Sequence, residues 1–174
     1  MEYIFTLKYL LASDEADARQ MVERLGEVGC TDALLGIGQP GRLALEFSRE
    51  APSARAAMLS ALAEVKQALP TACLFEAAPD YVGLSDVAEI VGVSRQNLRK
   101  LMLGYPATFP APMHEGSTSL WHLAEVLTWL VEHAGYEIDE GIRETARAAL
   151  EVNLATATRR LAPSRSKDLE RLVG

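Results

Sequence analysis

The sequence predicts an α+β fold, and two observations support this prediction. The first 78 residues alternate between apolar patterns of period two and apolar patterns of helical period, whereas the remainder is mainly helical. With 174 residues, of which 49% are hydrophobic and 24% charged, the chain is long enough to bury one ordinary core or two small ones. We therefore expect two packed units, residues 1–78 and 79–135, followed by a helical segment over residues 136–174.

The first unit is predicted to contain four strands and two helices. Apolar residues alternate in the strand segments, as Tyr3, Phe5 and Leu7 do, and recur at helical spacing between them. The order strand-helix-strand-strand-helix-strand is the ferredoxin-like arrangement, an antiparallel sheet with two helices on one face, and it settles no function by itself. The expected strands cover residues 3–11, 33–38, 42–48 and 71–76, and the helices run from Ser13 or Asp14 to Gly29 and from Ser53 to Leu69.

The C-terminal segment is predicted to be one long helix from Asp139 to Leu161. Residues 77–80 are interpreted as a linker before the second unit, and residues 166–174 as a short helix or a tail. The long helix has an alanine-rich stripe that either packs on the chain's own units or mediates dimerisation. Its members are Ile142, Ala146, Ala149, Leu150, Asn153, Leu154, Ala157 and Leu161.

Residues 81–102 have the spacing of a helix-turn-helix. Ser85 is expected to cap a short first helix, Gly92 to supply the positive φ of the turn, and Ser94 to cap the second helix. Apolar positions recur so that the two helices can cross closely: Val87, Ala88, Val91, Val93, Leu98, Leu101 and Met102. This coincidence favours a helix-turn-helix over a plain helical hairpin.

Positive charge in the second unit is confined to the second helix of this motif. The chain has a net charge of -7, yet all three basic residues of positions 80–133 lie there, as Arg95, Arg99 and Lys100. Recognition helices read bases with their N-terminal residues, so we assign Arg95, Gln96 and Asn97, beside Ser94, to base contacts. Arg99 and Lys100 are assigned to phosphates. The alternative is a solvated charged face.

The residues after this helix carry a family resemblance. A Phe109-Pro110-x-Pro112 stretch, a glycine-containing hairpin ending at Trp121, and a helix with Glu125-Val126-x-x-Trp129-Leu130 follow in order. Together with the helix-turn-helix, residues 81–132 resemble the AlpA/excisionase branch of the MerR-like winged helix-turn-helix family. The resemblance implies a wing over residues 114–119 that contacts the DNA backbone. It would use His114, Ser117, Thr118 and Ser119, because this wing lacks the arginine or lysine common in the family.

These observations predict a sequence-specific transcriptional regulator that binds double-stranded DNA as a homodimer, because three basic residues in one small module would bind weakly. The alternative is a protein-interaction adaptor or antitoxin-like module that binds DNA only secondarily. Residues 1–78 contain no histidine and no catalytic constellation, so we expect a ligand or protein sensor, or an oligomerisation unit, rather than an enzyme.

Cofactor, metal and compartment are expected to be unexceptional. No histidine or cysteine spacing suggests a metal site, and we expect no cofactor. Cys30 and Cys73 are expected to be buried and reduced, and the N-terminal stretch resembles neither a signal peptide nor a membrane span. The sequence therefore predicts a cytoplasmic protein.

Overall fold

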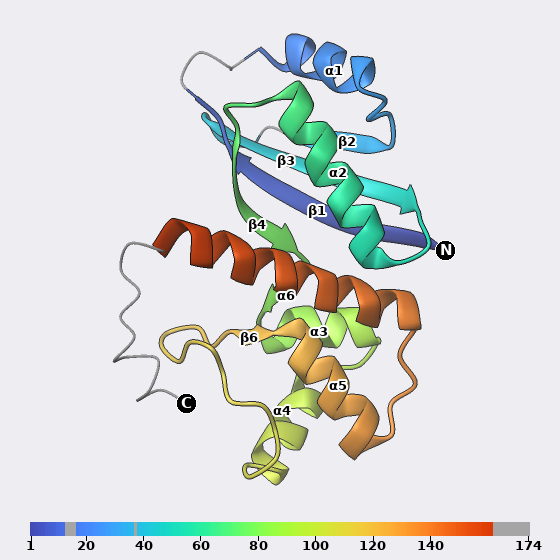
Figure 1. Ribbon diagram of the computed structural model, residues 1–174. Coiled ribbons are helices and arrows are strands. Elements are labelled where there is room, and N and C mark those ends of the chain that lie inside the picture. The colour runs from blue at the N-terminus through green and yellow to red at the C-terminus, as the bar shows by residue number, and fades with distance from the viewer. Residues whose placement is uncertain (13–16, 37, 162–174) are drawn as a thin grey trace.

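The computed structural model describes residues 1–12, 17–36 and 38–161, and it confirms the α+β class (Figure 1). The elements of the first half follow the expected order. The first half contains β1 (Glu2–Leu10), α1 (Ala18–Glu27), β2 (Ala33–Gly36), β3 (Arg42–Glu50), α2 (Ala54–Ala68) and β4 (Cys73–Ala78). The second half contains β5 (Tyr81–Val82), α3 (Leu84–Val91), α4 (Arg95–Gly104), β6 (Trp121–His122), α5 (Leu123–Ala134) and α6 (Glu140–Leu161).

The four long strands form one antiparallel sheet in the order β2-β3-β1-β4. β1 pairs with β3 along its whole length, from Glu2 opposite Glu50 to Leu10 opposite Arg42. Every second residue of β1 is buried beneath α1 and α2, because side chains alternate between the two faces of a strand (Figure 1). This is the ferredoxin-like strand order that the period-two pattern predicted.

The helices of the first half begin at polar caps. Ser53, the expected start of α2, is its N-cap, and its side chain accepts a hydrogen bond from the backbone N–H of Ala56. α1 begins at Ala18 with Asp17 as its N-cap, whereas the expected caps Ser13 and Asp14 lie outside the described residues.

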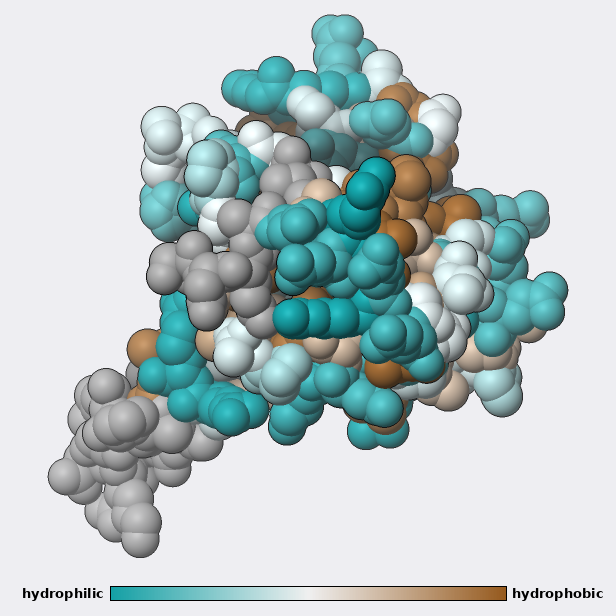
Figure 2. Space-filling model, turned by 90° about the horizontal axis from the view of Figure 1, so that it is seen from above, coloured by the Kyte–Doolittle hydropathy of each residue, from teal (hydrophilic) through white to brown (hydrophobic). Residues whose placement is uncertain are grey.

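Seen from above, the molecule presents a mainly hydrophilic surface with scattered hydrophobic patches (Figure 2).

The two cysteines have different environments, so the expectation of two buried thiols is wrong for one of them. Cys30 is buried in the core of the sheet, and this burial raises the pKa of its thiol to about 11. Cys73 is exposed because it is the first residue of β4, a strand at the edge of the sheet. Both thiols are free.

The second half is a helical unit with a small two-stranded sheet, formed by β5 and β6. Val87, Ala88 and Leu98 are buried between α3 and α4, and Gly92 between them has a φ of 72° in the left-handed region. Trp121 and Trp129 are core residues, with Phe109 packed against both at ring-centroid distances of 6.3 and 5.0 Å.

One expected cap of this unit is wrong. Gly83, not Ser85, is the N-cap of α3, because the helix begins at Leu84. The Asp86 carboxylate accepts a hydrogen bond from the backbone N–H of Gly83 at 2.7 Å and thereby occupies one free donor at the helix start. Among the described residues, no helix is long and apolar enough to cross a membrane.

Helix α6 lies between the sheet and the helical unit and contributes to both cores (Figure 1). Ala148 and Ala149 pack in the core of the sheet, whereas Ala146 packs in the core of the helical unit. Of the two alternatives for the alanine-rich stripe, the structure therefore shows packing within the chain. Leu154 and Leu161 are nevertheless 54% and 53% exposed.

The expected linker over residues 77–80 is instead a buried junction. Ala77, the last residue but one of β4, is fully buried. The Asn153 side chain bonds both of its backbone groups, accepting from the N–H at 2.7 Å and donating to the C=O at 2.8 Å. The same Asn153 amide donates to Asp80 at 2.7 Å, and the other Asp80 oxygen lies 2.8 Å from Nδ1 of His122. Residues 77–80 are predicted to be a linker because alanine, proline and aspartate are typical of linkers. In the structure, the distant Asn153 satisfies the polar groups of Ala77 and Asp80.

Candidate nucleic-acid interface beside helix α4

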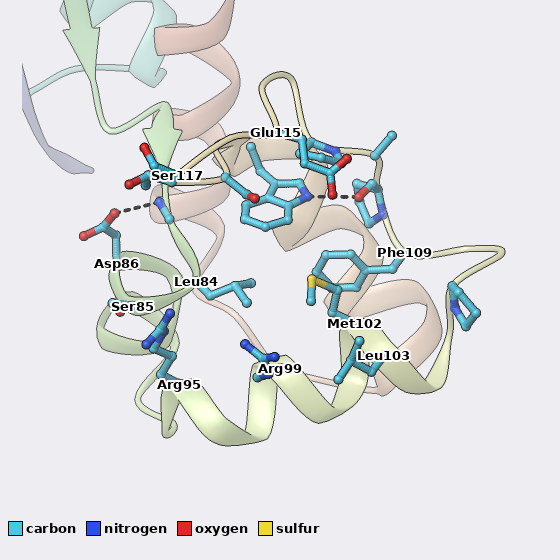
Figure 3. Close-up of a pocket in the computed structure, with 18 residues that line it drawn as sticks. Leu84, Ser85, Asp86, Arg95, Arg99, Met102, Leu103, Phe109, Glu115 and Ser117 are labelled. Atoms are coloured by element: carbon cyan, nitrogen blue, oxygen red, sulfur yellow. Dashed lines mark hydrogen bonds between the residues drawn. The ribbon is translucent and has the colours of Figure 1, made fainter.

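A cleft with a volume of about 780 Å³ lies between α4, the start of α3 and the loop of residues 105–120 (Figure 3). We call it the α4 cleft. It is lined by Arg95 and Arg99 of the predicted recognition helix and by most residues of the predicted wing.

The predicted contact residues of α4 lie in three rows along the helix: Arg95 with Arg99, Gln96 with Lys100, and Asn97 alone. Arg95, Arg99 and Leu103, spaced by four residues, line the α4 cleft, and both guanidinium groups point from α4 into it (Figure 3). Gln96 and Lys100 are exposed in the adjacent row and are not among the described lining residues. Residues four apart share a row because of the helical period, and Leu98 is fully buried on the opposite side of the helix.

The remaining predicted residues of α4 have local partners. Ser94 is the N-cap, as predicted, and its hydroxyl accepts a hydrogen bond from the backbone N–H of Asn97 at 3.2 Å. The side-chain amide of Asn97 donates to the Tyr136 hydroxyl at 3.4 Å. Asn97 therefore lies on the flank of α4 that faces away from the cleft and toward the segment before α6.

The wing loop, residues 114–119, is closed by an antiparallel bridge between His114 and Leu120. Ser117 and Thr118 line the α4 cleft, together with Ser119. His114 is exposed and is not among the described lining residues; a side chain at Gly116 would meet its Nε2 at 2.8 Å. The structure therefore brings three of the four predicted wing residues together with Arg95 and Arg99.

Sequence reasoning missed the acidic side chains of this cleft. Glu115 in the wing loop and Asp86 at the start of α3 line it beside the two arginines. The Asp86 carboxylate already accepts the Gly83 N–H, and neither Arg95 nor Arg99 forms an ion pair with another described residue. Their charges are therefore available to an external anion, although Glu115 lowers the local positive potential.

The α4 cleft has a polar end and an apolar end. The polar end holds Arg95, Arg99 and the hydroxyls of the wing loop (Figure 3). The apolar end is formed by Met102, Leu103, Pro106, Phe109, Pro110 and Pro112. Leu103 is 62% exposed there, an exposure that the helical spacing alone did not single out.

A second polar cluster lies in the first half, around Arg49, and was also missed. The guanidinium bonds Asp32 through two nitrogens at 2.7 and 2.8 Å, Glu64 at 2.6 and 3.1 Å, and Ser60 at 2.8 Å. These bonds hold the pKa of Asp32 below its ordinary value. Cys30, Asp32 and Glu64 come close enough to hold a metal ion, but both carboxylates are already engaged by the guanidinium. We therefore assign this cluster a structural role.

Comparison with known proteins adds no relative. No family model, curated protein or solved structure matches the chain. The functional argument therefore depends on the residues of this chain.

Proposed function

We propose that this protein is a sequence-specific regulator that binds double-stranded DNA through α4 and acts as a dimer. The observation that carries the proposal is the exposed, basic N-terminal part of α4, whose opposite face is held by the buried Leu98. A helix fixed in this way can enter the major groove while its polar side chains meet base edges and phosphates. The resemblance of residues 81–132 to AlpA-like and MerR-like proteins supports the same role.

The three rows of α4 suggest a division of labour that refines the expectation from sequence. Gln96 and Lys100 are exposed and do not line the α4 cleft, so we assign Gln96 to base contact and Lys100 to the groove or its edge. Arg95 and Arg99 face the wing loop, so both are assigned to the phosphates of the strand that would pass between helix and loop. Asn97, which faces Tyr136, is assigned a smaller part.

Dimerisation is part of the proposal because the basic surface is small. The cleft contains two acids beside its two arginines, and the wing loop contributes hydroxyls, which add little counterion release. A second half-site multiplies the affinity without requiring more charge in each copy. The sheet of residues 2–78 is then the sensor or oligomerisation unit of a cytoplasmic regulator.

The test is selection of bound DNA from a random duplex library, followed by fluorescence anisotropy at several salt concentrations. We expect one enriched motif, and Arg99→Ala should weaken binding to it by tenfold or more and reduce the salt slope by about 1. Arg19→Ala, an exposed arginine on α1, is the matched control and should leave binding unchanged. Absence of an enriched motif, or equal binding by the Arg99 variant, would refute the proposal.

A protein-binding adaptor is the second candidate, favoured by the apolar end of the α4 cleft. An acidic and apolar partner segment would match both ends of this cleft better than a phosphate backbone does. A stoichiometric protein complex that is lost in Leu103→Ala, with no DNA motif enriched, would identify this role instead.

A further inference from the structure

An apolar groove of about 300 Å³ lies between α2 and α6 on the side away from the α4 cleft. Figure 1 shows the two helices diverging toward the C-terminal end of α6, with β4 beneath them. Its lining includes Met58, Leu62, Leu74 and Val152, and Leu59 stands at its edge with 46% of its surface exposed. The groove is thus an apolar surface that nothing in the described chain covers.

The α6 side of this groove has a symmetric arrangement of charges. Glu151, Ala155 and Arg159 lie four residues apart, so they share one face of the helix. Glu151 precedes Ala155 by four residues in the chain, and Arg159 follows it by four. Eight residues of helix separate Glu151 from Arg159, which is about 12 Å.

We propose that a second copy of this chain occupies the groove, with the two α6 helices antiparallel and a two-fold axis at Ala155. This arrangement places Glu151 of each copy opposite Arg159 of the other, so two ion pairs form for each dimer. Ala155 meets its own counterpart, and its small side chain allows the helices to approach closely. Leu59 of each copy enters the apolar groove of the other, as an isologous interface requires.

In a single copy of the chain, Glu151 has only a weak ionic partner, and Arg159 has none among the described residues. Glu151 accepts a hydrogen bond from Arg55 at 3.0 Å, but the two side chains are 61% and 66% exposed, so their pairing contributes little stability. Arg159 is exposed and forms no ion pair with another described residue. Burying Leu59 and the groove removes apolar surface from water, and the ion pairs set the register.

This interface rests on the dimer of the proposed function and names its surface, and its test requires no DNA. The mass of the full-length protein is measured by light scattering and sedimentation across a concentration series. We expect a dimer, and Glu151→Arg or Arg159→Glu alone should raise its dissociation constant about tenfold or more, because like charges then face each other. The double variant, and an equimolar mixture of the two single variants, should recover dimerisation.

A matched pair of leucines completes the test. Leu59→Glu should give monomers, whereas Leu154→Glu, on another face of α6 with similar exposure, should leave the dimer intact. Circular dichroism of each variant separates loss of dimer from loss of fold. A monomeric wild type, a dimer indifferent to the single charge reversals, or a double variant that stays monomeric would overturn the interface. A monomeric wild type would also remove the dimer from the proposed function, whereas DNA binding itself is decided by the separate selection and anisotropy measurements.

Discussion

The two halves of the molecule use arginine in opposite ways. In the sheet, Arg49 is 8% exposed and is held by Asp32, which precedes β2, and by Ser60 and Glu64 of α2. In the helical unit, Arg95 and Arg99 are exposed on one helix and pair with no other described residue. The same side chain thus serves as an internal crosslink in one half and as an outward charge in the other, where an anion can reach it.

This difference distinguishes an arginine that stabilises the fold from an arginine that can bind a ligand. An arginine whose donors are all used by the protein has nothing left for a ligand, whereas an unpaired arginine on a rigid helix keeps its full charge and hydrogen-bonding capacity. Charge counts along the sequence do not distinguish the two cases, since an acid near in space need not be near in the chain.

The largest effect is expected from breaking the internal crosslink that Arg49 forms. Arg49→Ala leaves two half-buried carboxylates facing each other, so we expect the free energy of unfolding to fall by about 3 kcal/mol. Urea denaturation measures this, with Arg19→Ala as the exposed control and Arg95→Ala as the comparison from the other half. Both of these should change stability by less than about 0.5 kcal/mol. A loss below about 1 kcal/mol for Arg49→Ala would contradict the assigned role.

An intermediate effect concerns the junction between the halves. Asn153→Leu removes the partner of the buried Ala77 backbone and one partner of Asp80, which should cost about 2 kcal/mol. We also expect hydrogen exchange to increase together in β4 and β5, the strands that flank the junction. Leu154→Ala, at the exposed neighbouring position, is the control. Unchanged exchange in both strands would show that the junction does not couple the halves.

The smallest effect tests the turn of the helical unit. Gly92 has a φ of 72° with open space around it, so Gly92→Ala should cost about 1 kcal/mol through backbone strain alone. Gly104, at the end of α4, also has open space but no positive φ, and its replacement by alanine should be neutral or slightly stabilising. Thermal unfolding of the two variants compares them directly. Equal melting temperatures would mean that the turn tolerates a side chain.

Much of the fold was predictable because its signals are local. Tyr3, Phe5 and Leu7 alternate along one strand, and the pattern from Val87 to Leu98 specifies two crossing helices through spacing alone. The failures were polar residues with distant partners. Asp80 read as linker and Asn153 as part of an apolar stripe, whereas each is buried by contact with the other. An asparagine within an apolar stripe was the one signal available.

The candidate site divides in the same way. That α4 carries the positive charge of its unit, and that Ser94 caps it, follows from the sequence, because both depend on residues close together in the chain. The tertiary structure alone decided that Arg95 and Arg99 face the wing loop, that Glu115 lies beside them, and that Asn97 faces Tyr136. Period and capping depend on neighbours a few residues apart, whereas the surroundings of a side chain depend on which distant segments the packing brings to it.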